Sequence, residues 1–183
     1  KPMTPLAARS DAPGQLTITY QAGEANLEVR YILQIGYVEA LLPTPASEAI
    51  GCVTLPGSFT PEGERLKLLL PIMQGMLWDG RGPTMSYMRG EGSHQGFSMA
   101  FLGYLGERGG LLVTAETGEC GAFADDCRWW YGKDSENRVW ATNLQIASLG
   151  SMRYERVVRI YVTEADIVAI AKQYRRKVIE QGR

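Results

Sequence analysis

The sequence is poor in the residues that most often build metal and redox sites. It contains one histidine, His94, and three cysteines, Cys52, Cys120 and Cys127. One imidazole and two thiols seven residues apart make a poor zinc set, so no metal and no cofactor are expected. An odd number of cysteines is not a disulfide framework. Two readings stay open: all three are plain thiols, or Cys120 and Cys127 pair across a loop.

Long apolar runs and a surplus of one charge are also missing. No run of about 18 or more apolar residues occurs, so no membrane-spanning helix and no membrane partner are expected. The opening "KPMTPLAARSDAPGQ" lacks the apolar stretch of a signal peptide. It does not begin with Met, which is typical of a processed protein or an excised piece. The 183 residues carry 19 basic against 20 acidic side chains. Because nucleic-acid binders usually show a basic excess or stripe, neither DNA nor RNA is expected as the main partner.

The common nucleophile and phosphate-binding motifs are absent too. His94 lies in "RGEGSHQG", which is not a Gly-x-Ser-x-Gly nucleophile motif. The glycine-rich "GRG" and "GERGG" are not followed by the Lys-Ser/Thr of a P-loop. Glycoside hydrolysis needs two carboxyl groups about 5–10 Å apart. Adjacent Asp125 and Asp126 would point to opposite faces of an extended strand, so they make a poor pair. No catalytic residue is therefore assigned within this chain.

Alternating apolar and polar residues are abundant, and they predict strands. We expect strands at 15–21, 26–42 (bulged or divided at Gly36), near 50–55, at 65–73 (limited by Pro71), 84–88, 97–106, 109–117, 139–149 and 153–162. The segments 74–96 and 118–138 are otherwise expected to be loops. Nothing alternates β with α, so the predicted fold class is mainly β: an antiparallel β-sandwich, supersandwich-like, with a C-terminal α-helix.

The period changes to a helical one at 163–182. Apolar residues there share one face: Ile167, Ile170, Ala171, Tyr174 and Val178. Thr163 is the expected N-cap, with Asp166 completing a capping box, and Gly182 suits the position after the C-cap. The basic residues of this segment are interpreted as a solvated face, with an acidic partner as the alternative: Lys172, Arg175, Arg176 and Lys177. The predicted organisation is a lead-in at 1–14, a sandwich domain at 15–162 and the helix at 163–183.

Two clusters combine aromatic rings with charged groups, as sugar-binding sites do. Aromatic faces stack on pyranose rings, and Asp and Arg hold hydroxyl groups through charge-assisted hydrogen bonds. One cluster lies in "PIMQGMLWDGRGP" and the other in "ADDCRWWY". The candidate sugar-binding residues are Trp78, Asp79, Arg81, Asp126, Trp129 and Trp130. Structural packing is the alternative interpretation of each cluster.

The C-terminal part resembles a known family. The sequence runs through "FSMAFLGYLGERGGLLVTAET", a loop with "ADD", and "YERVVRIYVTEADIVAIAKQYRRKVIEQGR". This order is similar to the end of the N-terminal, galactose-mutarotase-like β-supersandwich domain of large glycoside hydrolases. Examples are the endo-α-N-acetylgalactosaminidase-like enzymes and relatives of α-galactosidase. The family's closing motif corresponds here to Arg159, Tyr161, Ala171, Tyr174 and Arg175. The resemblance covers 97–183, extends loosely over 65–96 and matches 1–64 only as generic strands.

The resemblance implies that the helix leads towards a catalytic (β/α)₈ barrel that is missing from this chain. The family's catalytic carboxylates lie on that barrel. The implied role is a non-catalytic, carbohydrate-associated accessory domain whose "MLWDGRGP" loop helps shape the substrate pocket. One alternative is a free-standing sugar-binding or mutarotase-like protein, in which His94 would have to serve in acid–base catalysis. Another is a structural or interaction domain without a small ligand.

Overall fold

The computed structural model describes residues 4–22, 25–43, 52–54, 58–59, 67–71, 75–78, 85–89, 99–117, 127–133, 139–142, 145–147 and 154–182. The short strands between 52 and 59, the strand at 85–89 and those between 127 and 147 are described by their backbone pairing. Within this part of the chain the fold is mainly β, every strand pair is antiparallel, and the last element is one α-helix. The predicted fold class is confirmed.

A large sheet of nine strands forms the centre of the molecule, in the order β1-β2-β3-β4-β15-β11-β10-β7-β8. Its members are β1 (Thr4–Ala12), β2 (Gln15–Ala22), β3 (Ala25–Gln34), β4 (Tyr37–Leu42), β7 (Lys67–Leu70), β8 (Met76–Trp78), β10 (Phe101–Leu105), β11 (Gly110–Ala115) and β15 (Arg156–Thr163). Strand β15, near the end of the chain, lies between β4 and β11. It therefore joins the N-terminal meander to the β10–β11 hairpin.

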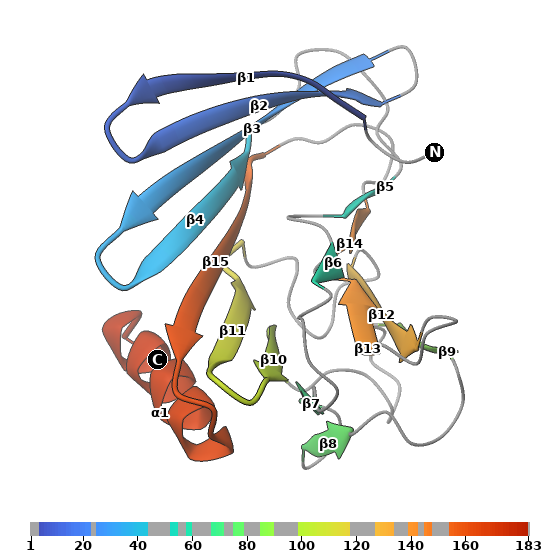
Figure 1. The fold of residues 1–183 in the computed structure, drawn as a ribbon, viewed down its shortest axis with the longest axis vertical. Helices are drawn as coiled ribbons and strands as arrows, with labels where there is room; N and C mark the ends of the chain where they lie inside the picture. The colour runs from blue at the N-terminus through green and yellow to red at the C-terminus, as the bar shows by residue number, and fades with distance from the viewer. Residues whose placement is uncertain are drawn as a thin grey trace.

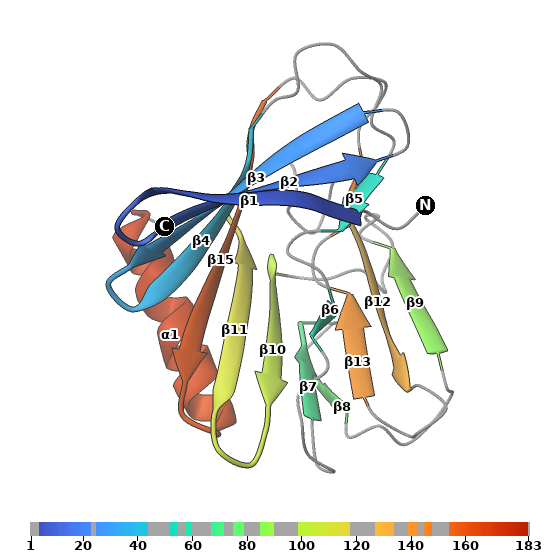
Figure 2. The ribbon, with the colours of Figure 1, turned by 45° about the horizontal axis from the view of Figure 1, so that its top comes forward.

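A second sheet has the order β5-β14-β12-β13-β6, and β9 also pairs with β12. Its strands are β5 (Cys52–Thr54), β6 (Ser58–Phe59), β9 (Met85–Arg89), β12 (Cys127–Lys133), β13 (Val139–Thr142) and β14 (Gln145–Ala147). In Figures 1 and 2, the central strands β15, β11 and β10 lie between this sheet and helix α1 (Ile167–Glu180). The nine-stranded sheet is thus the middle layer.

Glycines set two turns, of which the one at Gly36 was predicted and the one at Gly14, within the expected lead-in, was not. Gly14 and Gly36 have positive φ values of 74° and 89°, a conformation that costs glycine little. Gly36 therefore divides the expected 26–42 strand into β3 and β4. The two turns lie at the same end of the sheet (Figures 1 and 2), where the Leu33 amide donates to the Gly14 carbonyl oxygen at 2.7 Å. The predicted end of a strand at Pro71 and the β10–β11 hairpin are also confirmed.

Helix α1 packs on the sheet through a compact apolar cluster. Its members are buried Phe101, Leu105, Leu112, Tyr161 and Ile170, with Tyr37, Leu69 and Tyr174 packed against them. Gly103 allows the close approach, because a Cβ there would lie 2.9 Å from the Leu69 Cβ and 3.2 Å from the Ile170 Cδ1. Only part of the predicted apolar face is buried, since Ile167 and Ala171 are exposed.

The helix begins later than the sequence pattern predicts. Thr163 ends β15, and Asp166 is the N-cap, with its side chain accepting a hydrogen bond from the Ala169 amide at 3.3 Å. The prediction of Thr163 as N-cap is wrong, because that residue completes the sheet pairing with Gly110. Gly182 does follow the C-cap, with φ 72° and its amide bonded to the Ile179 carbonyl oxygen.

Three segments expected to be irregular contain strands. β1 lies within the expected lead-in at 1–14, β8 within the expected loop at 74–96, and β12 within the expected loop at 118–138. Each is held by pairing with a neighbouring strand: β1 pairs with β2, β8 pairs with β7, and β12 pairs with β9, β13 and β14. The expected single strand at 139–149 is divided into β13 and β14, which both pair with β12 on the side away from β9, in registers that differ by one residue.

Candidate functional site

The first predicted sugar-binding cluster begins at the end of β8. Trp78 is the last residue of that strand, and it is 7% exposed. Its ring is largely covered within this chain, so it anchors the segment that follows. Asp79 and Arg81 lie outside the described residues. The prediction that Trp78 lies in a loop is wrong, but its proposed neighbours do follow directly after a buried strand end.

The second predicted cluster lies on the other sheet. Trp129 and Trp130 belong to β12, where their backbones pair with Met88 and Tyr87 of β9. Asp126 lies outside the described residues. The two clusters thus belong to different sheets, and β8 lies beside the six-stranded sheet in both ribbon views (Figures 1 and 2). Their role in sugar binding stays a prediction.

A polar cluster that the sequence did not reveal lies under helix α1. Glu116 follows β11, and its side chain is 8% exposed. One carboxylate oxygen, Oε1, lies 2.9 Å from the Lys177 Nζ and accepts a hydrogen bond from the Thr114 hydroxyl. The other, Oε2, accepts from the Gln181 Nε2 at 2.9 Å and lies 3.5 Å from the Arg159 Nη1. We call this group, together with Glu39, the Glu116 cluster.

The hydrogen-bonding positions of Glu116 in this cluster are already occupied, and this excludes a role in catalysis or sugar binding. Both oxygens of Glu116 face two donors each, so neither is free to take a proton from a substrate or to hold a sugar hydroxyl. Arg159 is itself bound through its Nε to the Glu39 Oε2 at 2.9 Å. Strands β4, β11 and β15 and helix α1 all contribute, so the cluster ties the helix to three strands. Its role is structural.

The electrostatics of this cluster agree with its geometry. Burial alone would lower the pKa of Arg159, but the hydrogen bond to Glu39 and the charge of Glu116 outweigh it and raise that pKa. Burial raises the pKa of the neighbouring Tyr161 phenol, and the charge of Glu116 adds to the effect. Arg159 therefore stays a cation and Tyr161 stays neutral near pH 7.

One sequence signal could have revealed this cluster. Lys177 follows Ile170 by seven residues and Tyr174 by three, so it lies on the same helical face as the apolar contacts. The interpretation of the basic helix end as wholly solvated is wrong for Lys177, whose side chain is 6% exposed. No sequence pattern marked Glu116 in the same way, because a carboxylate that follows a strand is equally typical of a solvated loop.

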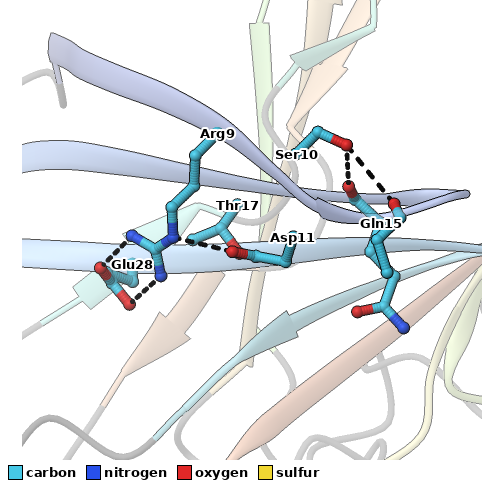
Figure 3. A network of polar contacts seen from close by, with 7 residues as sticks. Arg9, Ser10, Asp11, Gln15, Thr17 and Glu28 are labelled. Atoms are coloured by element: carbon cyan, nitrogen blue, oxygen red, sulfur yellow. Dashed lines mark hydrogen bonds and ion pairs between the residues drawn. The ribbon is translucent and has the colours of Figure 1, made fainter.

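A second polar network holds the edge of the sheet (Figure 3). Arg9 forms two hydrogen bonds with the Glu28 carboxylate, at 2.8 and 3.3 Å, and its Nε donates to Asp11 at 2.9 Å. The buried Thr17 hydroxyl donates to the other Asp11 oxygen. The hydrogen bonds lower the pKa of Asp11, with Thr17 contributing most, and the bond from Arg9 lowers that of Glu28. These contacts stabilise the exposed edge strand β1.

A groove runs along one side of α1 and the end of β15. Its volume is about 320 Å³, and it is lined by Val162, Thr163, Glu164, Asp166, Val168, Ala169, Lys172, Gln173 and Arg176. Apolar Val162 and Val168 are exposed there beside acidic and basic side chains. Trp78, the one predicted sugar-binding residue whose side chain is described, does not line it. Among the described residues, no set of three or more His, Cys, Asp or Glu side chains is grouped to hold a metal ion.

The described part of the chain contains no helix long and apolar enough to cross a bilayer. Its architecture defines a class: two antiparallel sheets and a closing helix, in a chain of 183 residues. No protein-family model matches the chain, and no curated protein matches it significantly. The similarity that does exist is to solved structures.

These structures are of the α-N-acetylgalactosaminidase NagBb from Bifidobacterium bifidum. Its complex with GalNAc has a TM-score of 0.73 and 20% sequence identity, covering 100% of this chain and 31% of that one. The ligand-free form has a TM-score of 0.72, 19% identity and coverages of 99% and 31%. The complex with Gal-NHAc-DNJ has a TM-score of 0.71 and 20% identity. The chain therefore has the fold of a part of this protein, and it spans about a third of its length.

Proposed function

We propose that this chain is a non-catalytic, carbohydrate-associated β-sandwich module of a glycoside hydrolase. In this proposal the module belongs to the galactose-mutarotase-like supersandwich type. It packs on a catalytic barrel of the same polypeptide and helps to shape that barrel's substrate pocket. The substrate class is an α-linked N-acetylgalactosaminide, as the name of the similar enzyme suggests.

One observation carries the proposal: essentially the whole chain superposes on about a third of a glycosidase. Coverage of 99–100% of this chain against 31% of that one is expected for a module of a larger enzyme. The saturated Glu116 cluster is consistent with it, because the buried carboxylate in the described chain is engaged in holding α1. Contact with the sugar is then assigned to residues outside this cluster.

Within the proposal, the segment after β8 is the part that reaches the pocket. Trp78 anchors its base in the sheet, and Asp79 and Arg81 hold sugar hydroxyls by charge-assisted hydrogen bonds. Asp126, Trp129 and Trp130 form the second proposed sugar-contacting group. Each contact with a hydroxyl is expected to contribute about 1–3 kcal/mol to binding.

The decisive experiment uses the complete polypeptide that carries this sequence. It should release the phenol from an aryl α-N-acetylgalactosaminide, whereas the 183-residue chain alone should release none. Replacing Asp79 by Asn and Arg81 by Gln in the complete polypeptide should raise KM about tenfold. Arg108→Gln, on the exposed β10–β11 turn, is the matched control and should leave KM unchanged.

Hydrolysis by the 183-residue chain alone would overturn the non-catalytic assignment. Anomerase activity in that chain, abolished by His94→Ala, would favour the mutarotase-like alternative instead. A complete polypeptide with no glycosidase activity on any aryl α-glycoside would overturn the proposal as a whole.

A further inference from the structure

The face of the nine-stranded sheet opposite α1 is apolar but unevenly covered. Cross-strand neighbours on this face form rows, because directly paired residues point to the same side. One row runs across β3, β4, β15 and β11 through Leu33, Val38, Ile160 and Val113. Exposure falls along it from 66% at Leu33 to 1% at Val113, with the two residues between them half-buried.

Two further rows show the same gradient. The first runs from Leu16 through Tyr31 to Ala40 and Val158, and exposure falls from 41% to 0%. The second runs from Val162 through Leu111 to Tyr104, and exposure falls from 77% to 1%. The apolar core of this face therefore continues past its covered part to one open corner. We call Leu16, Leu33 and Val162, with the fully exposed Ile35 of the β3–β4 turn, the open corner.

Val162 of the open corner also lines the groove beside α1, at the end of β15. In the groove, acidic Glu164 and Asp166 and basic Lys172 and Arg176 surround the apolar side chains. An apolar centre with a polar rim of both charges is the usual anatomy of a protein interface. Contiguous apolar side chains on adjacent strands are also unlike the scattered single exposures of an ordinary surface.

We propose that the open corner and the adjoining groove are the surface on which the catalytic domain of the same polypeptide docks. This inference rests on the proposed function. The length of the similar enzyme supports it, because more than two thirds of that enzyme lies outside the part that this chain matches. Helix α1, the last element described, forms one wall of the groove.

The test is cysteine labelling in the complete polypeptide. Leu33→Cys and Val162→Cys place a thiol in the open corner, and Leu6→Cys places one on the edge strand β1, where Leu6 is 54% exposed. Labelling by a maleimide is followed at each position by mass spectrometry of its peptide. We expect the two corner thiols to react at least tenfold more slowly than the control in the native protein, and at equal rates in denaturant.

Equal native rates at all three positions would overturn the docking inference, even if the polypeptide is an active glycosidase. Protection that disappears on dilution would also overturn it, because a second copy would then be the occupant. Glycosidase activity, measured on the same samples, tests the proposed function separately. As a second variant, Leu33→Asp with Val162→Asp should shorten the half-life of activity on heating at least fivefold, whereas Leu6→Asp should not.

Discussion

Single buried polar residues in this chain are held by several partners at once. Lys177 was predicted to be solvated, yet its ammonium group lies against Glu116 and 5.6 Å from the centre of the Tyr174 ring. The helical period placed Lys177 on the packed face, but no local pattern could supply its partner, 61 positions away in the printed sequence. Partners so far apart in the chain come together only through the fold.

Replacing Lys177 by Met should lower the free energy of unfolding by about 2–4 kcal/mol, because Glu116 keeps its other donors but loses its closest cation. Met retains the length and the packing of the removed stem. A double-mutant cycle with Glu116→Gln, measured by urea unfolding, should give a coupling of about 1–3 kcal/mol. Additive effects of the two substitutions would contradict this role.

Trp78 gives a second prediction at this scale. Trp78→Ala should lower the free energy of unfolding by about 3–5 kcal/mol, since the ring is buried on the sheet. Leu77→Ala, at the neighbouring and 41% exposed position, is the control and should cost much less. Urea midpoints measure both. A stable Trp78→Ala protein would mean that this side chain does not anchor the strand end.

At the scale of elements, the close packing of helix α1 on the sheet depends on the lack of a side chain at Gly103. Gly103→Val should lower the free energy of unfolding by about 1–3 kcal/mol, because a Cβ would meet Leu69 and Ile170. Ala7→Val, on exposed β1, is the control for adding a β-branched residue to a strand and should change little. Thermal unfolding followed by circular dichroism tests the pair. Unchanged stability of Gly103→Val would show that the helix can move away without cost.

The edge strand β1 gives a pH-dependent prediction. The folded-state pKa values of Asp11 and Glu28 are lowered from 3.8 and 4.5, so their contribution to stability is present above those values and is lost as pH falls below them. The urea midpoint should therefore decrease between about pH 5 and pH 3. Arg9→Gln should reduce that decrease, while Arg108→Gln should leave it unchanged. An identical pH profile for Arg9→Gln would contradict the role of the network.

Element prediction from the sequence worked best where the signal is local. Gly36 set the β3–β4 turn, and Gly182 follows the end of α1. It failed for β1 and β12, whose segments contain proline or many polar residues and whose stability as strands comes from pairing with β2, β9 and β13. It also misplaced the helix start, because Thr163 can cap a helix or complete a sheet, and pairing with Gly110 selects the second.

At the scale of the whole molecule, α1 and the sheet should unfold as one unit. The Glu116 cluster joins the helix to three strands, and the apolar cluster under it is shared by both. Urea unfolding followed by circular dichroism at the helix band and by tryptophan fluorescence should therefore give the same midpoint. A lower midpoint for the helix signal would show that α1 detaches first and that the cluster does not couple it to the sheet.

The sequence by itself determined the class of this fold. Alternating apolar residues, glycine turns and a single helical period predict antiparallel sheets closed by a helix, since these patterns act through neighbouring residues. Only the tertiary structure decided where β15 inserts, which lysine is buried, and that apolar rows end at an open corner. Those features depend on contacts between residues far apart in the chain, whose energies no short stretch of sequence contains.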